Sequence, residues 1–327
     1  MTSLQRRPEP AGGPALDAVS WRQRALGVLT VFGVGAAMAG QSRINGALGQ
    51  RLDDGIAAAV ISFGTGLLLL AALVPALPAG RRGMARVLTA LRAGTLRPWQ
   101  CLGGVCGALY VVGQAVSVPV VGVAVFTVAI VAGQVTSSLV VDRLGAGPSG
   151  VQPITVPRLC GAALAVVAVL VAMSGRFDGN VALWVALLPA LAGVGVAWQQ
   201  AVNGRVAAVA GAALPSALVN FVAGTVALVV ALAVSLALRG LPRSLPGEWW
   251  LYLGGPLGAV LIGIAAVVVR VTGVLLLGLG MVSGQLCGAV LLDLVLPTGR
   301  APLDAVTLAG TALTLVAVVV AALPARR

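Results

Sequence analysis

The sequence predicts an all-α integral membrane protein with ten transmembrane helices, arranged as two inverted repeats of five helices. Of its 327 residues, 59% are hydrophobic and only 9% are charged, and the mean hydropathy is +1.04. Soluble domains carry roughly a quarter charged residues, so most of this surface must face lipid. The apolar runs are long and continuous, unlike barrel strands, which alternate with a period of two. Finally, the second half of the chain repeats the rarer residues of the first.

Ten apolar runs match the roughly 20 residues that a helix needs to cross a bilayer. Two divisions between them need a reason. The run from Gln100 to Val141 has no charge and is long enough for two spans, with Pro119 expected in the turn because proline breaks helices. Arg270 divides the run from Trp249 to Leu292. The expected spans are 25–44, 56–78, 100–118, 121–141, 155–173, 181–201, 212–238, 249–269, 271–292 and 303–323.

The loop charges predict the orientation. Arginines precede the first span, follow the last one and fill the loop after the second, where Arg81, Arg82, Arg86, Arg92 and Arg97 have no acidic neighbour. Ten spans place these segments on one side, and the excess of positive charge makes that side cytoplasmic. Residues 1–24 are expected to form a disordered cytoplasmic tail, and the C-terminus should also be cytoplasmic.

The charge and the cysteines exclude several classes of function. The formal charge is +12, and all 21 basic residues are arginine. In a membrane protein this reflects cytoplasmic loops, so no nucleic-acid partner is expected. The chain has no histidine, and its four cysteines lie in apolar runs without a CxxC pair. No metal, no cofactor and no catalytic residue is therefore expected, and the protein is not expected to be an enzyme.

The internal repeat follows two successive shifts in numbering. A shift of 158 places Gln41 on Gln199, Asn45 on Asn203 and Phe63 on Phe221, while Ser62 falls on Asn220. A shift of 151 then places Gln134 on Gln285 and Asp142 on Asp293, and a shift of 149 aligns Gly161 with Gly310. The repeats are expected at 25–173 and 181–323. Because five spans are an odd number, the second repeat enters the membrane from the opposite side, as in many secondary transporters.

Two pairs of segments carry a resemblance to a known family. They are "QSRINGALGQRL…AAAVISFGTGLLLL" and "QQAVNGRVAAVAG…SALVNFVAGTVALVV". Over about residues 25–323 the chain resembles a fused pair from the YdcZ-like family of the drug/metabolite transporter superfamily. The resemblance implies a ten-helix fold in the bacterial cytoplasmic (inner) membrane, with the substrate path between the repeats. The small multidrug resistance proteins of that superfamily use a glutamate in their first helix, whereas the first span here has no carboxylate.

The candidate substrate path consists of polar residues inside the spans. Gln41 and Asn45 lie four residues apart on one helix face, and Gln199 and Asn203 repeat this spacing. They either bind a polar substrate or hydrogen-bond neighbouring helices, and the two asparagines are also candidates for helix caps. Both readings apply to four further residues, namely Gln134, Gln285, Ser62 and Asn220.

Three charged residues are candidates for gating or coupling. Asp142 and Asp293 end matching spans, with Arg143 or Arg158 as expected partners of Asp142 and Arg300 as that of Asp293. The alternative is that both are ordinary exposed loop charges. Arg43 lies between Gln41 and Asn45, where it either extends to the membrane surface or faces the cavity and favours an anionic or zwitterionic substrate.

These observations predict a secondary transporter, expected to export a small organic molecule by alternating access. The alternative is a lipid-handling protein of the flippase kind. The expected partners are the small-molecule substrate and the lipid bilayer, and a homodimer stays open. The sequence leaves the substrate, the coupling ion and the direction of transport open.

Overall fold

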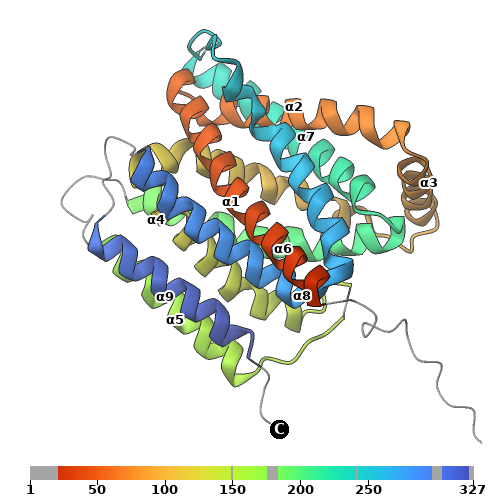
Figure 1. Cartoon of the computed structure of the whole chain (residues 1–327). Coiled ribbons are helices and arrows are strands. Elements are labelled where there is room, and N and C mark those ends of the chain that lie inside the picture. Colours follow the sequence, from red (N-terminus) through yellow and green to blue (C-terminus); the bar gives the residue numbers. More distant parts are fainter. Residues whose placement is uncertain (1–20, 149, 175–182, 241, 297–303, 324–327) are drawn as a thin grey trace, which may run out of the picture.

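A computed structural model describes residues 21–148, 150–174, 183–240, 242–296 and 304–323 (Figure 1). Every regular element in these ranges is helical. The elements are α1 (Trp21–Leu52), α2 (Gly55–Ala76), α3 (Pro78–Arg92), η2 (Pro98–Cys101), α4 (Gly103–Arg143), α5 (Val156–Ser174), α6 (Leu183–Ala210), α7 (Ala213–Arg239), η3 (Trp249–Leu253), α8 (Gly254–Val295) and α9 (Ala305–Ala321). The predicted tail and Arg300 lie almost wholly outside the described residues.

By length and composition, several helices are fit to cross a membrane. Among the described residues, five segments are long and apolar enough: most of α1, all of α2, η2 with α4, most of α7 and the C-terminal part of α8. Shorter apolar helices include α5 and α9. In the ranges given above, the chain is thus helical throughout its regular structure, with several helices apolar enough for a membrane.

Helix α4 consists of two halves that fold back on each other at Gly122. A straight helix of its 41 residues would be about 60 Å long, twice the thickness of a bilayer core. Gly122 has φ 81° and ψ 167°, a conformation that glycine adopts readily, and this residue breaks the helix. Beyond the break, the ring of Phe126 packs on Tyr110 with centroids 5.9 Å apart. The turn thus lies at Gly122, while Pro119, expected there, lies within the first half.

Helix α8 folds back in the same way, as its contacts with α1 show. Gly254 and Gly258 pack against the side chains of Asn45 and Gln41, so this half of α8 runs opposite to α1. Gly280 lies against Val31, whereas Gly288 lies against Ala36, so the second half runs along α1 in the same direction. A straight helix would separate Gly258 from Gly280 by about 33 Å, far more than the distance along α1 between these contacts. α8 must therefore turn between them.

The contacts repeat under the numbering shifts read from the sequence. α1 packs along α8, and the corresponding helices α6 and α4 pack along each other. A Cβ on Gly104 would overlap the carbonyl oxygen of Asn220, and a Cβ on the matching Gly255 would overlap that of Ser62. Helices α2 and α7 meet where Phe63 and its counterpart Phe221 pack with ring centroids 4.9 Å apart. α5 and α9 lie side by side at one edge (Figure 1).

Two expectations about helix ends are wrong. The arginine-rich segment after the second span is not a loop but largely the helix α3, whose Arg86 donates from Nη1 to the carbonyl oxygen of Ala210 at 3.2 Å. Asn45 and Asn203 are not helix caps, because α1 and α6 each continue for seven residues beyond them.

The two aspartates of the repeat lie at opposite ends of the bundle. Asp293 contacts Val123 and Ala124, at the start of the second half of α4. Asp142 lies 19 residues beyond Val123 on that half, or about 28 Å along the helix. We refer below to the Asp293 end and the Asp142 end.

Candidate functional site

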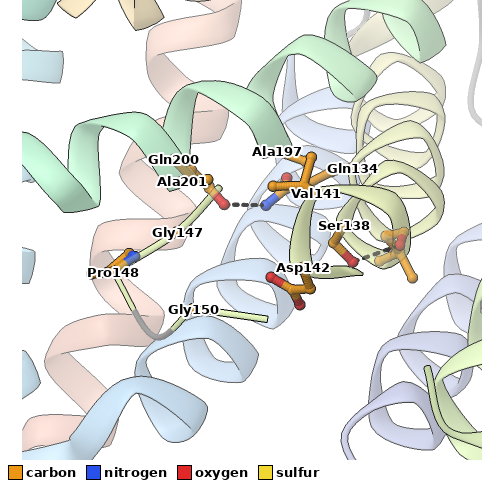
Figure 2. Close-up of a pocket in the computed structure, with 11 residues that line it drawn as sticks. Gln134, Ser138, Val141, Asp142, Gly147, Pro148, Gly150, Ala197, Gln200 and Ala201 are labelled. Atoms are coloured by element: carbon orange, nitrogen blue, oxygen red, sulfur yellow. Dashed lines mark hydrogen bonds between the residues drawn. The ribbon is translucent and has the colours of Figure 1, made fainter. Parts of the chain in front are cut away.

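A pocket of about 310 Å³ opens at the Asp142 end, between α4, α6 and the segment that follows α4 (Figure 2). Within it, Gln134 donates from Nε2 to Oε1 of Gln200 at 3.0 Å. Ser138 lies one turn beyond Gln134 on α4, and Asp142 one turn beyond Ser138. Its lining comprises Gln134, Val135, Ser138, Val141, Asp142, Gly147, Pro148, Gly150, Ala197, Gln200 and Ala201.

Two arginines hold the mouth of the pocket. Arg158 forms an ion pair with Asp142, in which the side chains are 24% and 35% exposed. Arg205 on α6 donates to the carbonyl oxygens of Gly145 and Ala146, just after α4 ends. Of the two partners expected for Asp142, the structure has Arg158. Because the pair is open to water, it contributes about 0–1 kcal/mol to stability.

The matching position at the Asp293 end is filled. The shifts of 158 and 151 carry the pocket residues Ala197, Ser138 and Gln200 onto Ala39, Ala289 and Ser42, each of which is 0% exposed. Ala39 and Ala289 belong to a packed cluster with Val118, Val121, Val123 and Ala124, which surround the turn of α4. Positions related by the repeat therefore line an open pocket at one end and a solid core at the other.

The carboxylate of Asp293 binds the turn of α4 beside this core. Its Oδ1 accepts from the backbone N–H of Val123 at 3.2 Å, and its Oδ2 accepts from that of Ala124 at 2.7 Å. These N–H groups begin a helix, where the helix dipole favours a negative charge. Asp293 is only 4% exposed, so it is not the exposed loop charge that the sequence left as an alternative.

Ion pairs add to the closure of the Asp293 end. Arg51 at the end of α1 pairs with Glu248 at 2.7 Å, and Asp53 pairs with Arg243 at 3.2 Å. Both pairs join the first repeat to the segment before η3. All four side chains are a third or more exposed, so each pair contributes little.

The predicted amide pairs make hydrogen bonds in contacts between helices. Gln41 donates to the carbonyl oxygen of Gly254 at 2.9 Å. Gln199 and Asn203 both donate to Oδ1 of Asn220, at 3.0 and 2.9 Å. Asn45 donates to Gln114 at 2.6 Å. Of the predicted path residues, Gln134 lines the pocket, whereas the other seven lie outside its lining.

Arg43 lies deeper than expected, because α1 continues nine residues beyond it. Its Nη1 is buried and has no protein hydrogen-bond partner. The sequence reading missed Gln200, Ser138, Tyr110 and Gln114. The repeat was read from matching residues, and the counterparts of these four are Ser42, Ala289, Leu261 and Ala265.

Comparisons with known proteins identify the family. The family described as "Putative inner membrane exporter, YdcZ" matches residues 26–171 and 184–320, once in each repeat. A solved structure described as "Crystal structure of protein" is 18% identical, covers 92% of this chain and 97% of its own, and has a TM-score of 0.47. No curated protein matches the chain. The family match spans nearly the whole chain, and the chain therefore belongs to the YdcZ family of inner membrane transporters.

Proposed function

We propose that the protein is a secondary transporter that exports a small organic molecule by alternating access. The observation that carries the proposal is the difference between the two ends. Matching residues line an open pocket at the Asp142 end and are packed around the turn of α4 at the Asp293 end. Two near-equivalent halves in different states are what a rocking transporter requires at each stage of its cycle.

The proposal includes ten crossings in two inverted repeats. Counting α4 and α8 as two spans each, and leaving α3 out, the described helices supply ten crossings. An alternating path then places the arginines of α3 and the Asp142 end on one side, which the charge rule makes cytoplasmic. The contact between Arg86 and Ala210, at the end of α6, agrees with that path. The pocket would thus open to the cytoplasm, where an exporter takes up its substrate.

Gln134, Gln200 and Ser138 are the proposed contacts for substrate in this state. Six further residues lie in close contacts between helices and are proposed to border the path. They are Gln41, Asn45, Ser62, Gln199, Asn203 and Asn220. Asp293 is proposed to hold the external gate shut, and Asp142 to release the internal gate through its pair with Arg158. In the opposite state the two ends would exchange these roles.

Reconstitution in proteoliposomes tests the transport function. Vesicles loaded with a mixture of small metabolites should release at least one solute in a protein-dependent manner, detected by mass spectrometry of the outer buffer. Replacing both Gln134 and Gln200 by alanine should slow this release without reducing membrane insertion. A labelled phospholipid in the same vesicles gives the comparison. Protein-dependent scrambling of that lipid without solute release would contradict the proposal and favour the flippase alternative.

A further inference from the structure

A buried polar cluster between α1, α4 and α8 has hydrogen-bonding groups without partners. It consists of Ser42, Tyr110, Gln114 and Gln285. Gln114 donates from Nε2 to Oγ of Ser42 at 2.8 Å and accepts from Asn45 through Oε1, so both ends of its amide are used. By contrast, Oη of Tyr110 and Nε2 of Gln285 are buried and have no protein partner. The Tyr110 hydroxyl lies near Ser42, Gln114 and Gln285 but forms no hydrogen bond of normal geometry with any of them.

The repeat shows that this cluster is not part of the general packing. The close glycine contacts between helices recur in both halves, as those of Gly104 and Gly255 do. Tyr110 and Gln114 fall on Leu261 and Ala265, so the second repeat has no such cluster. Gln285 falls on Gln134, whose Nε2 does bond Gln200. A buried polar group without a hydrogen-bond partner lowers the stability of the fold by about 1–3 kcal/mol. The cluster contains two such groups, and the matching contacts of the second repeat form without them.

The cluster lies beside the path already described. Gln285 precedes Asp293 by eight residues, as Gln134 precedes Asp142, so each lies about 12 Å from its end of the bundle. On one side the ring of Tyr110 packs against Phe126 and forms an apolar wall. Thr127, adjacent to Phe126, has a buried hydroxyl that also lacks a partner, and it lies seven residues before Gln134 on the same face of α4.

The charges nearby set the class of ligand. Every acidic residue in the described part of the chain lies at a helix end or in a connecting segment. Asp293 already accepts two backbone N–H groups, so no described carboxylate is available to a cation in the cluster. The groups without partners in and beside the cluster belong to Tyr110, Gln285, Thr127 and Asn45, and all are neutral. Arg43 follows Ser42 by one residue on α1 and so leaves the helix about 100° away from it.

We propose that this cluster is the central recognition site for the transported molecule. It takes an uncharged compound with hydrogen-bonding groups for Tyr110 and Gln285 and an apolar part against the ring pair. The proposal rests on the transporter function and deepens it. A cationic substrate is excluded by it.

The first test needs no ligand. If the Tyr110 hydroxyl and the Gln285 amide N–H bond only to a ligand, the protein without ligand bears the cost of burying both groups unbonded. Tyr110→Phe and Gln285→Leu each remove one such group, so each should raise the unfolding temperature of the detergent-purified protein. For a chain of this size a rise of about 2–4 °C is expected. Gln114→Leu is the matched control, because it leaves Asn45 and Ser42 without their partner and should lower the midpoint. A fall with all three variants would overturn the proposal, since the cluster would then be structural.

The second test measures the charge preference with three probes that share one aromatic side chain. They are N-acetylphenylalaninamide (neutral), N-acetylphenylalanine (anionic) and phenylalaninamide (cationic). At millimolar concentration the neutral probe should raise the unfolding temperature most, and Tyr110→Phe should abolish that rise. A larger rise with a charged probe, no rise with any probe, or a rise that persists in Tyr110→Phe would overturn the proposal. None of these outcomes affects the proteoliposome result, which tests transport itself.

Discussion

The Asp142 end and the Asp293 end are assembled from matching residues, yet one holds a pocket and the other a packed core. Asp142 pairs with an arginine at the water-facing mouth, whereas Asp293 is buried on two backbone N–H groups of the α4 turn. The positions correspond, although Gln200 and Ser138 are matched by the smaller side chains Ser42 and Ala289, so smaller side chains lie in a tighter core and the helices must also be placed differently. This is the difference between the ends that the proposed alternating-access cycle requires.

The largest expected effect concerns the close glycine contacts that both ends share. Gly104 and Gly255 both lie where an added Cβ would overlap the backbone of α7 or α2. Gly104→Val and Gly255→Val should therefore cost several kcal/mol each, since neither backbone can move easily. Size-exclusion chromatography after expression should show little monodisperse protein for either variant.

Gly64→Val is the control for those substitutions, because no atom lies within 4 Å of its added Cβ. It should behave like the wild type. A loss at only one of the two glycines would show that the ends are less alike than their matching contacts indicate.

The next largest effect concerns Asp293, whose carboxylate bonds the α4 turn, whereas that of Asp142 pairs with Arg158. Asp293→Ala removes a charged acceptor of two hydrogen bonds, worth about 1.5–3 kcal/mol to the closed Asp293 end. The open population at that end should rise about 10- to 150-fold. In a background without the native cysteines, an Ala289→Cys thiol reports this change through its rate of labelling by a membrane-impermeant maleimide.

Two controls isolate the role of Asp293. Asp142→Ala removes the matching carboxylate, and Asp304→Ala removes one that accepts from the N–H of Thr307 at the start of α9. Neither should speed labelling of the Ala289→Cys thiol. Equal acceleration by Asp304→Ala would mean that loss of any helix cap loosens the bundle, and the proposed gate would lose its support.

The amide contacts should give a smaller effect that is similar at both ends. Gln41→Ala and Gln199→Ala each remove hydrogen bonds between helices, which contribute about 0.6–2 kcal/mol in membranes. The double variant should insert into the membrane normally, lower the unfolding temperature and slow solute release. Unfolding temperatures and proteoliposome flux measured on the same preparations check this. Normal flux in the double variant would leave these residues a packing role only.

The smallest effect should come from the exposed ion pairs. Arg158→Gln at the Asp142 end and Arg51→Gln at the Asp293 end each break one pair whose partners are partly open to water. Each should cost less than about 1 kcal/mol, and high salt should reduce the cost. Unfolding midpoints at low and high salt measure it. A larger cost at Arg158 would show that the Asp142 end is held by its ion pair and not by the placement of the helices.

The residues that the sequence could assign are those that the repeat preserves. Phe63 and Phe221, or Gly104 and Gly255, are recognisable because they recur, and the structure packs them at matching contacts. The site depends more on residues that do not recur. Gln200, Tyr110 and Gln114 have unrelated counterparts, so a search for matches passes over them.

The turn of α4 shows a second limit. Pro119 is the stronger helix breaker by local preference, but the chain turns at Gly122, where the backbone needs a positive φ. Pro119 lies three residues earlier, in the last turn of the first half, where its missing N–H removes one backbone hydrogen bond without ending the helix. Similarly, the arginines of α3 predict an exposed loop. The segment forms a helix instead, because Gly83 allows it to pack closely on Ala210 and Pro215.

The most direct test of the account measures access to two matching positions. Ser138 lines the pocket, and Ala289 is its counterpart in the closed core. Single cysteines at these positions are labelled by an impermeant maleimide in spheroplasts and in inverted vesicles. We expect Ser138→Cys to be labelled from the cytoplasmic face and Ala289→Cys to be labelled little while Asp293 is present. Once Asp293 is replaced by alanine, Ala289→Cys should be labelled from the external face. Labelling of both positions from the same face would contradict the account.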